Sequence, residues 1–597
     1  MRSKTKLFVL VFAALLIATN VSVQAQQDMQ NMPGMNKPNP KSKANQKPVA
    51  KRKQPAQAKP KQTDADQMNG MEMPAVSPTP TPTPEPKEMP SPTEMSMPGM
   101  NMPTGTPSPA PSPEKREENA PQTSPSPDAQ QKGDMSDMNM SGTGNQSQPA
   151  KSDDSMQGMK MDGMTHPSSG TGRVSADDPR ALMIMSGEMM EIRLGSSQRN
   201  SIAMGQMGSG TSWQPTTTPM YMWTKAADKW LVFIHGDAKI GVNAEGGPRG
   251  VTKIESQNWI MPMAFRRVKG GTLQLRGMFS LEPLTFSPGG SPQLFQTGES
   301  YKGVPLVDKQ HPHDLFMELS ASYTVPLGER ATWFVYGGFP GEPALGPTAF
   351  MHRWSASENP SAPLAHHLQD STHISFGVVS TGFTYRWFKL EGSLFNGREP
   401  DENRYNFEFH PLNSRSVRLS IAPTENLSMQ WSYGLLKDPE ALKPGDVRRM
   451  TASVSYNKRF ERGNWATSLI WGRNDESHTL EVESLNGYLA ESTVNFLDKN
   501  YIYTRLELVD KTDLLSDGDI QRLGILDHHA MFRIGAYTFG AARDVWKTNN
   551  FSLAVGSDVT FYSKPDVLDS IYGVNPISGK FFLRIRPNRM SMGSSGQ

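Results

Sequence analysis

The residues of this 597-residue sequence with the clearest capacity for chemistry are methionines. Eighteen of them lie in residues 26–175, a stretch that contains no Phe, Trp, Tyr, Leu or Ile. A thioether is a soft, uncharged ligand that selects soft ions, Cu(I) above all. Their groups recur at spacings of two and three residues at 29–35, 68–73, 95–102, 135–140 and 156–164.

This repetition predicts weak Cu(I) binding along the segment, because flexible chain between close methionines lets several sulfurs surround one ion. His166 could add an imidazole to the last group. The alternatives are a linker that is merely rich in methionine, or a sink for oxidants. The candidate ligands are Met95, Met97, Met100, Met102, Met135, Met138, Met140, Met156, Met159, Met161, Met164 and His166. No tightly bound cofactor is expected.

Histidines form a second candidate metal site. The motifs QHPHD (310–314) and AHHLQDSTH (365–373) place imidazoles beside carboxylates, a combination that can bind Zn, Cu or Ni. The candidate ligands are His311, His313, His366 and His367, drawn from the connections 283–313 and 339–373. The alternatives are polar loops that simply carry histidine, or hydrogen bonds within a folded loop plug.

Other patterns are less informative. The charged run at 396–410 is interpreted as a solvated loop with internal ion pairs, with an acidic constriction of a cation channel as the alternative. No GxSxG motif occurs, and no nucleophile stands beside a base. The chain is therefore predicted not to be an enzyme, and a hydrolase at the rim of a barrel remains an alternative.

Composition and the N-terminal residues indicate the cellular compartment of the protein. The net charge of +2 gives no reason to expect a nucleic-acid partner, and the absence of cysteine excludes thiolate chemistry. Basic residues followed by the apolar run 7–18 and by small residues at 23 and 25 predict a secretory signal at 1–25. No later segment has the length of an apolar transmembrane helix, so a mature membrane protein would have to be a barrel.

The chain divides into unlike parts. Residues 26–175, rich in Pro and Met, cannot bury enough apolar surface to fold and are predicted to be disordered. Residues 176–229 are a linker or a plug segment in which 181–194 forms a short helix or a strand. Residues 588–597 are a C-terminal tail. The region between, 230–587, is predicted to be an all-β, antiparallel transmembrane barrel.

Period-two alternation of apolar and polar residues predicts about sixteen strands in this barrel region. The connections support a membrane barrel because they alternate in length: very short ones, such as 269–270 and 461–463, follow long ones, with 541–549 as an exception. Mixed charge on the inward face suggests a wet lumen. The predicted strands are 230–241, 257–268, 271–282, 314–325, 331–338, 373–386, 388–396, 415–422, 427–437, 447–460, 464–473, 487–497, 499–509, 529–540, 550–562 and 579–587.

A signal peptide, a Met-rich segment and a barrel together resemble the bacterial copper-resistance protein B family. That resemblance covers the architecture and the Met groups, and it implies periplasmic copper handling by an outer-membrane barrel. The barrel sequence, with QHPHDLFMELSASY and AHHLQDSTHISFG, is more similar to an uncharacterised outer-membrane family. The predicted function is Cu(I) handling or resistance, and the alternative is a porin-like channel for small solutes with the tail as a spacer. The expected location is the bacterial outer membrane, with the tail in the periplasm and lipid, periplasmic copper proteins or the cell wall as partners.

Overall fold

The computed structural model describes residues 178–590 except 187–188, 196–199, 478–481 and 528–529. The chain divides into two units, Met1–Lys151 and Ser152–Gln597, and every described residue belongs to the second. The predicted signal and the whole Met-rich segment, residues 26–175, therefore lie outside the described residues.

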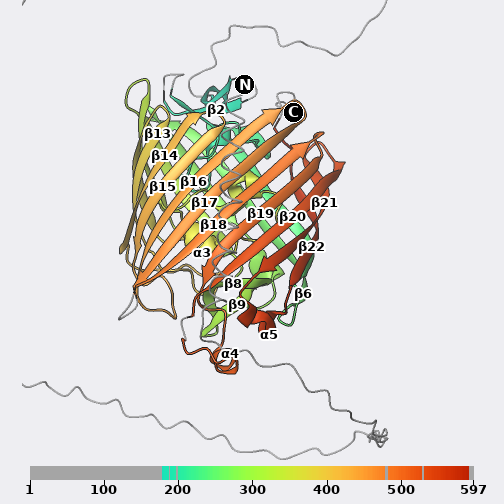
Figure 1. Cartoon of the computed structure of the whole chain (residues 1–597). Coiled ribbons are helices and arrows are strands. Elements are labelled where there is room, and N and C mark those ends of the chain that lie inside the picture. The colour runs from blue at the N-terminus through green and yellow to red at the C-terminus, as the bar shows by residue number, and fades with distance from the viewer. Residues whose placement is uncertain (1–177, 187–188, 196–199, 478–481, 528–529, 591–597) are drawn as a thin grey trace, which may run out of the picture. The chain divides into compact units, whose positions relative to one another are not determined.

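Sixteen antiparallel strands form the wall of a closed barrel, as the alternation predicts (Figure 1). Each strand pairs with its neighbours in sequence, and β22 closes the ring on β5 through a register that runs from Gly579↔Ala244 to Ile585↔Ala238. Each of the sixteen predicted strands overlaps one of these. The wall strands are β5 (Trp230–Ala244), β6 (Thr252–Val268), β7 (Gly271–Phe279), β10 (Phe316–Pro326), β11 (Ala331–Gly338), β12 (Val378–Tyr385), β13 (Phe388–Phe395), β14 (Ser414–Thr424), β15 (Leu427–Leu436), β16 (Asp446–Phe460), β17 (Gly463–Ser477), β18 (Val482–Phe496), β19 (Asn500–Lys511), β20 (Phe532–Lys547), β21 (Phe551–Ser563) and β22 (Ile577–Pro587).

Many strands of the wall carry apolar side chains outside and polar or charged side chains inside. On β13, for example, Leu390 and Leu394 are half exposed on the outer face, whereas Glu391 and Ser393 are buried on the inner face. A soluble protein shows the opposite arrangement, and an apolar exterior around a polar interior is typical of a barrel that spans a membrane. Closure also leaves no unpaired strand edge, as a lipid environment requires.

Connection length separates the two ends of the barrel. Apart from the connection between β17 and β18, the short turns between wall strands, such as 269–270, 386–387 and 548–550, lie at the end where the described chain begins and where β22 ends (Figure 1). The prediction of a long connection at 541–549 is wrong, because β20 continues to Lys547. At the other end the prediction of a long connection between residues 473 and 487 is also wrong. β17 continues to Ser477 and β18 already begins at Val482.

One short strand adds to the wall at the end with the short turns. β4 (Met222–Ala227) pairs with the first half of β5, while β22 pairs with its second half. A single bridge, Tyr221↔Arg589, lies just before β4 and just after β22. The sequence did not predict β4.

The remaining elements lie in the connections and before the wall. A small sheet joins β1 (Met183–Ser186), β2 (Met189–Arg193) and β3 (Ser201–Ala203), so the residues at 181–194 are mainly strands. β8 (Ser291–Tyr301) and β9 (Val304–Gln310) form a hairpin between β7 and β10. The short helices are η1 (Pro179–Leu182), η2 (Met204–Gln206), α2 (Glu282–Thr285), η3 (Phe350–His352), η4 (Trp354–Ala356), α3 (His366–Gln369), η5 (Ser371–His373), α4 (Asp517–Leu523), η6 (Asp566–Leu568) and α5 (Asp569–Tyr572). Among the described residues, none of these helices has the length and apolar character needed to cross a bilayer.

Candidate functional site

The connection between β11 and β12, residues 339–377, folds into the barrel and is called the plug loop below. Its base is closed by Gly341 and Ser375, whose backbone N–H groups each donate to the other's carbonyl at 2.9 Å. Between these residues the loop reaches distant wall strands: Ala365 donates to Glu507 of β19, and Arg353 donates to Glu491 of β18 at 2.7 Å. Helix α3 lies inside the wall in Figure 1 and contacts β16, β17 and β18.

Glu358 ties the plug loop to β22. Its carboxylate accepts hydrogen bonds from Arg584 and from Arg586, the latter at 2.9 Å. All three side chains are at most 3% exposed. The Arg586 guanidinium also lies over the Tyr221 ring at 4.0 Å from its centroid. The expectation of a wet lumen is therefore wrong at this place, because the charges on the wall are paired with the loop rather than hydrated.

Glu342 occupies a buried position near the base of the plug loop. Its carboxylate lies 3.8 Å from Arg418 of β14, and its backbone N–H donates to the Tyr336 hydroxyl at 3.0 Å. Burial raises the pKa of Glu342 to about 8, against the opposing charge of Arg418, and the carboxylate of Glu318 raises it further. The side chain is therefore largely protonated at neutral pH.

This gives the barrel a defined pH dependence. Folding raises the pKa of Glu342 from about 4.5 to about 8, so the folded protein binds this proton more tightly than the unfolded chain does. The stability that the bound proton provides is complete below about pH 4.5 and is lost as the pH rises to about 8. Relative to Glu342→Gln, the unfolding free energy of the wild type should therefore fall across this window by at most about 1.4 kcal/mol per pH unit. Urea unfolding in detergent at several pH values measures the difference, and parallel profiles for the two proteins would contradict it.

A second segment, residues 204–221, enters the lumen from the end with the short turns and is called the entry segment below. The backbone carbonyl of Thr211 accepts from Lys389 of β13, and its hydroxyl accepts from Arg418 at 2.9 Å. Farther along, the carbonyl of Thr217 accepts from Arg459 of β16 at 2.7 Å. The entry segment meets the plug loop where the hydroxyls of Ser212 and Thr348 are 2.9 Å apart.

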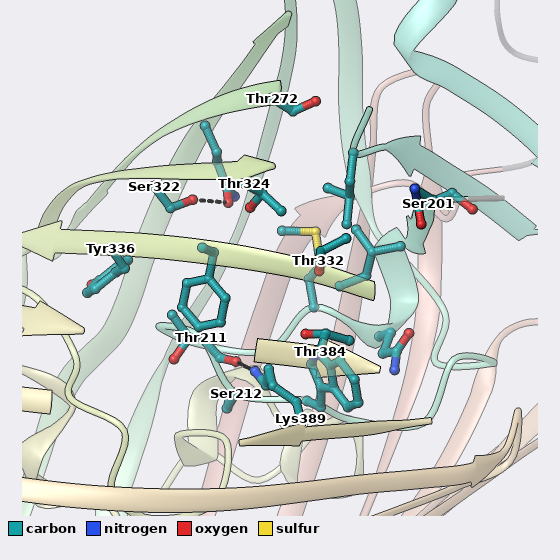
Figure 2. A pocket seen from close by; sticks show the side chains of 18 of the residues that line it. Ser201, Thr211, Ser212, Thr272, Ser322, Thr324, Thr332, Tyr336, Thr384 and Lys389 are labelled. Atoms are coloured by element: carbon teal, nitrogen blue, oxygen red, sulfur yellow. Dashed lines mark hydrogen bonds between the residues drawn. The ribbon is translucent and has the colours of Figure 1, made fainter. Parts of the chain in front are cut away.

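A cavity of about 470 Å³ lies between the entry segment and the wall strands β7, β10, β11, β12 and β13 (Figure 2). Figure 2 shows hydroxyl groups from opposite sides pointing into it, among them Thr324, Thr332 and Thr384. Arg276, which pairs with Glu318 at 2.7 Å, and Lys389 bring positive charge to its lining. A volume of this size with hydroxyl and cationic groups suits a small polar solute. No local pattern in the sequence indicates this cavity, because its lining comes from many segments that are far apart in the chain.

The histidines of the two long connections lie together, as the sequence suggested. The His366 ring centroid is 5.3 Å from that of His367 and 5.2 Å from that of His373, while His311 lies 5.5 Å from His367 and His313 lies 5.3 Å from His373. Burial lowers the pKa of His366 to about 4 and that of His367 to about 3, so both are neutral at neutral pH. Among the described residues, no three His, Asp or Glu side chains are arranged closely enough to bind one metal ion as they are placed. Metal binding by His311, His313, His366 and His367 stays a prediction.

Carboxylates surround this histidine group. His311 Nε2 lies 3.0 Å from Glu299, and His367 Nδ1 lies 3.3 Å from Glu399. Arg404 donates to Glu299 and to Asp314 and is only 5% exposed. The interpretation of 396–410 as a solvated loop is therefore wrong at Arg404, which is buried and bonded to residues of another connection.

The methionines divide between described and undescribed regions. All the predicted Met ligands from Met95 to Met164, with His166, lie outside the described residues. Within the barrel, a buried apolar cluster includes Met204, Met261, Met263, Met278 and Met317. These side chains pack against one another and against the small sheet β1–β3, which is the ordinary role of methionine in a core.

No family model matches the chain, and no curated protein matches it. Among solved structures, the chain is similar to the anion-selective porin from Comamonas acidovorans, with a TM-score of 0.38 and 10% identity over 60% of this chain and 99% of that one. It is also similar to OmpT, an outer membrane protein of Vibrio cholerae, with a TM-score of 0.35 and 8% identity over 62% and 100% of the two chains. A third is Pseudomonas aeruginosa OpdK with vanillate, with a TM-score of 0.33 and 10% identity over 60% and 99%.

Proposed function

We propose that this chain is a porin-like barrel of the bacterial outer membrane, and that it passes small polar solutes through a lumen that the plug loop narrows. The observation that carries the proposal is the charged inner wall, of which Arg418, Glu491 and Arg584 are members. A barrel that served only as an anchor would have no need of a charged interior, whereas polar and charged linings govern passage through channels. The short-turn end faces the periplasm, as in other such barrels, and this supports a periplasmic position for the N-terminal segment.

Liposome swelling in an isosmotic solution of a neutral monosaccharide tests this proposal. The intact chain should admit the sugar slowly, and a chain that lacks the plug loop should admit it fast, because a lumen of this strand number is wide enough for an aqueous channel. Heat-modifiable migration on a gel shows that both barrels are folded. Swelling of both at the rate of empty liposomes would contradict the proposal.

Copper handling is a second candidate, favoured by a contact inside the barrel. His235 Nε2 lies 3.1 Å from the sulfur of Met261, and the His235 ring is 5.5 Å from that of His352. Thioether and imidazole together are ligands that copper accepts. The repeated Met groups of residues 26–175 would collect Cu(I), with periplasmic copper proteins as donors.

The tail provides a direct test of copper handling. We expect a peptide of residues 130–166 to bind Cu(I) under reducing conditions at least about tenfold more tightly than the same peptide with Leu at every Met, because leucine lacks a donor atom. Competition against a chromogenic Cu(I) chelator measures the two affinities. Equal affinities would remove the copper hypothesis for the tail.

A further inference from the structure

Three buried histidines of the lumen share an arrangement that the channel function does not require. His313 lies between β9 and β10, whereas His366 and His373 belong to the plug loop. They are 3%, 0% and 8% exposed. The His373 ring contacts both others, at centroid distances of 5.3 Å and 5.2 Å.

Each of these rings is held through its Nδ1 atom. His313 Nδ1 lies 2.8 Å from the carboxylate of Glu282, and His366 Nδ1 lies 2.7 Å from that of Asp370. His373 Nδ1 lies 2.8 Å from the backbone carbonyl of Asp370. Carboxylate and carbonyl oxygens only accept, so each Nδ1 carries the hydrogen and donates it.

The opposite ring atom, Nε2, is buried without a hydrogen-bond partner in all three residues. A buried polar atom without a partner costs free energy and calls for an explanation. An imidazole whose Nδ1–H is held by an oxygen and whose Nε2 is free is the state in which histidine binds a metal ion, with the oxygen as the outer partner. Three such imidazoles form the ligand set of many zinc centres.

We propose that the Nε2 atoms of His313, His366 and His373 bind one divalent first-row transition ion. The site goes beyond solute passage, since the ion would join the β9–β10 connection to the plug loop whether or not the barrel conducts. In their present positions the described side chains do not form a group of three ligands around one point. Binding therefore requires that the rings turn their Nε2 atoms toward one point, and His373 already contacts both other rings at centroid distances of 5.2–5.3 Å.

Charge near the site favours a cation. Glu282 has no basic partner other than His313 among the contacts of the described residues. Asp370 is shared between His366 and Arg353, the latter at 2.7 Å. The ligand identity selects the class of ion, because imidazole suits Zn²⁺, Ni²⁺ and Cu²⁺ and the site contains no thioether.

Titration of the purified full chain with Co²⁺, followed by its visible absorption, tests the site. Co²⁺ is suitable because it accepts imidazole, whereas the methionines of residues 26–175 favour softer ions. We expect about one Co²⁺ per barrel with the intense bands of tetrahedral coordination, displaced by Zn²⁺. His373→Ala should weaken binding at least about tenfold, since it removes one of three ligands.

The matched control is His410→Ala, which changes a partly exposed histidine that pairs with Glu408. It should bind Co²⁺ as the wild type does. The proposal is overturned if His373→Ala keeps wild-type affinity, or if the wild type shows only the weak bands of octahedral Co²⁺. Heat-modifiable migration shows whether each variant is folded, and if His373→Ala is not, the wild-type spectrum alone decides.

Discussion

Deletion of the plug loop should convert a nearly closed barrel into an open channel. Gly341 and Ser375 already pair through two backbone hydrogen bonds, so residues 342–374 can be replaced by a short glycine link without moving β11 or β12. The deletion removes the partners of wall residues such as Glu491 and Glu507, which water would then hydrate. Because a barrel of sixteen strands has room for an aqueous pore, single-channel conductance in planar bilayers should rise at least about tenfold.

A deletion elsewhere provides the control for this measurement. Helix α4 lies in the connection between β19 and β20, at the outer edge of the long-loop end (Figure 1). Removal of residues 516–524 should leave the conductance unchanged, since these residues do not enter the lumen. A plug-loop deletion that folds to a heat-modifiable barrel and conducts no better than the wild type would show that another element closes the pore.

The sequence predicted the wall well because the wall depends on local signals. Alternation fixes which face of each strand is apolar, and tight turns such as 461–462 fix where neighbouring strands meet. The errors occurred where those signals are weak. β4 is short and pairs only with half of β5, and the end of β20 carries Arg543 and Asp544, charged residues that are typical of a loop.

The interior was predicted less well, since the path of a long loop depends on contacts between residues far apart in sequence. The pairing of Glu358 with Arg584 joins positions that no local pattern relates. The histidines were the exception. Each of the two motifs carries closely spaced histidines, and each lies in a long connection between wall strands. These connections are at the same end of the barrel, so their residues can meet.

Glu358→Ala should be among the most destabilising single changes in this chain. The substitution leaves the guanidinium groups of Arg584 and Arg586 buried without the carboxylate that pairs them, and Arg584 then keeps Asp544 as its carboxylate partner. Removal of one partner from a buried ion pair costs about 3–5 kcal/mol, because the remaining charge is neither paired nor hydrated. Urea unfolding of the purified barrel in detergent measures the loss.

An exposed ion pair of the same type gives the matched comparison. Lys437 and Asp446 pair at the long-loop end with side chains that are 51% and 43% exposed. Asp446→Ala should change the unfolding free energy by at most about 1 kcal/mol, because water screens and replaces the pair. Comparable losses for Asp446→Ala and Glu358→Ala would mean that water reaches Glu358, and the plug loop would then not seal this side of the lumen. A loss confined to Glu358→Ala places the seal at β22, where the loop's carboxylate neutralises two arginines that would otherwise attract water into the pore.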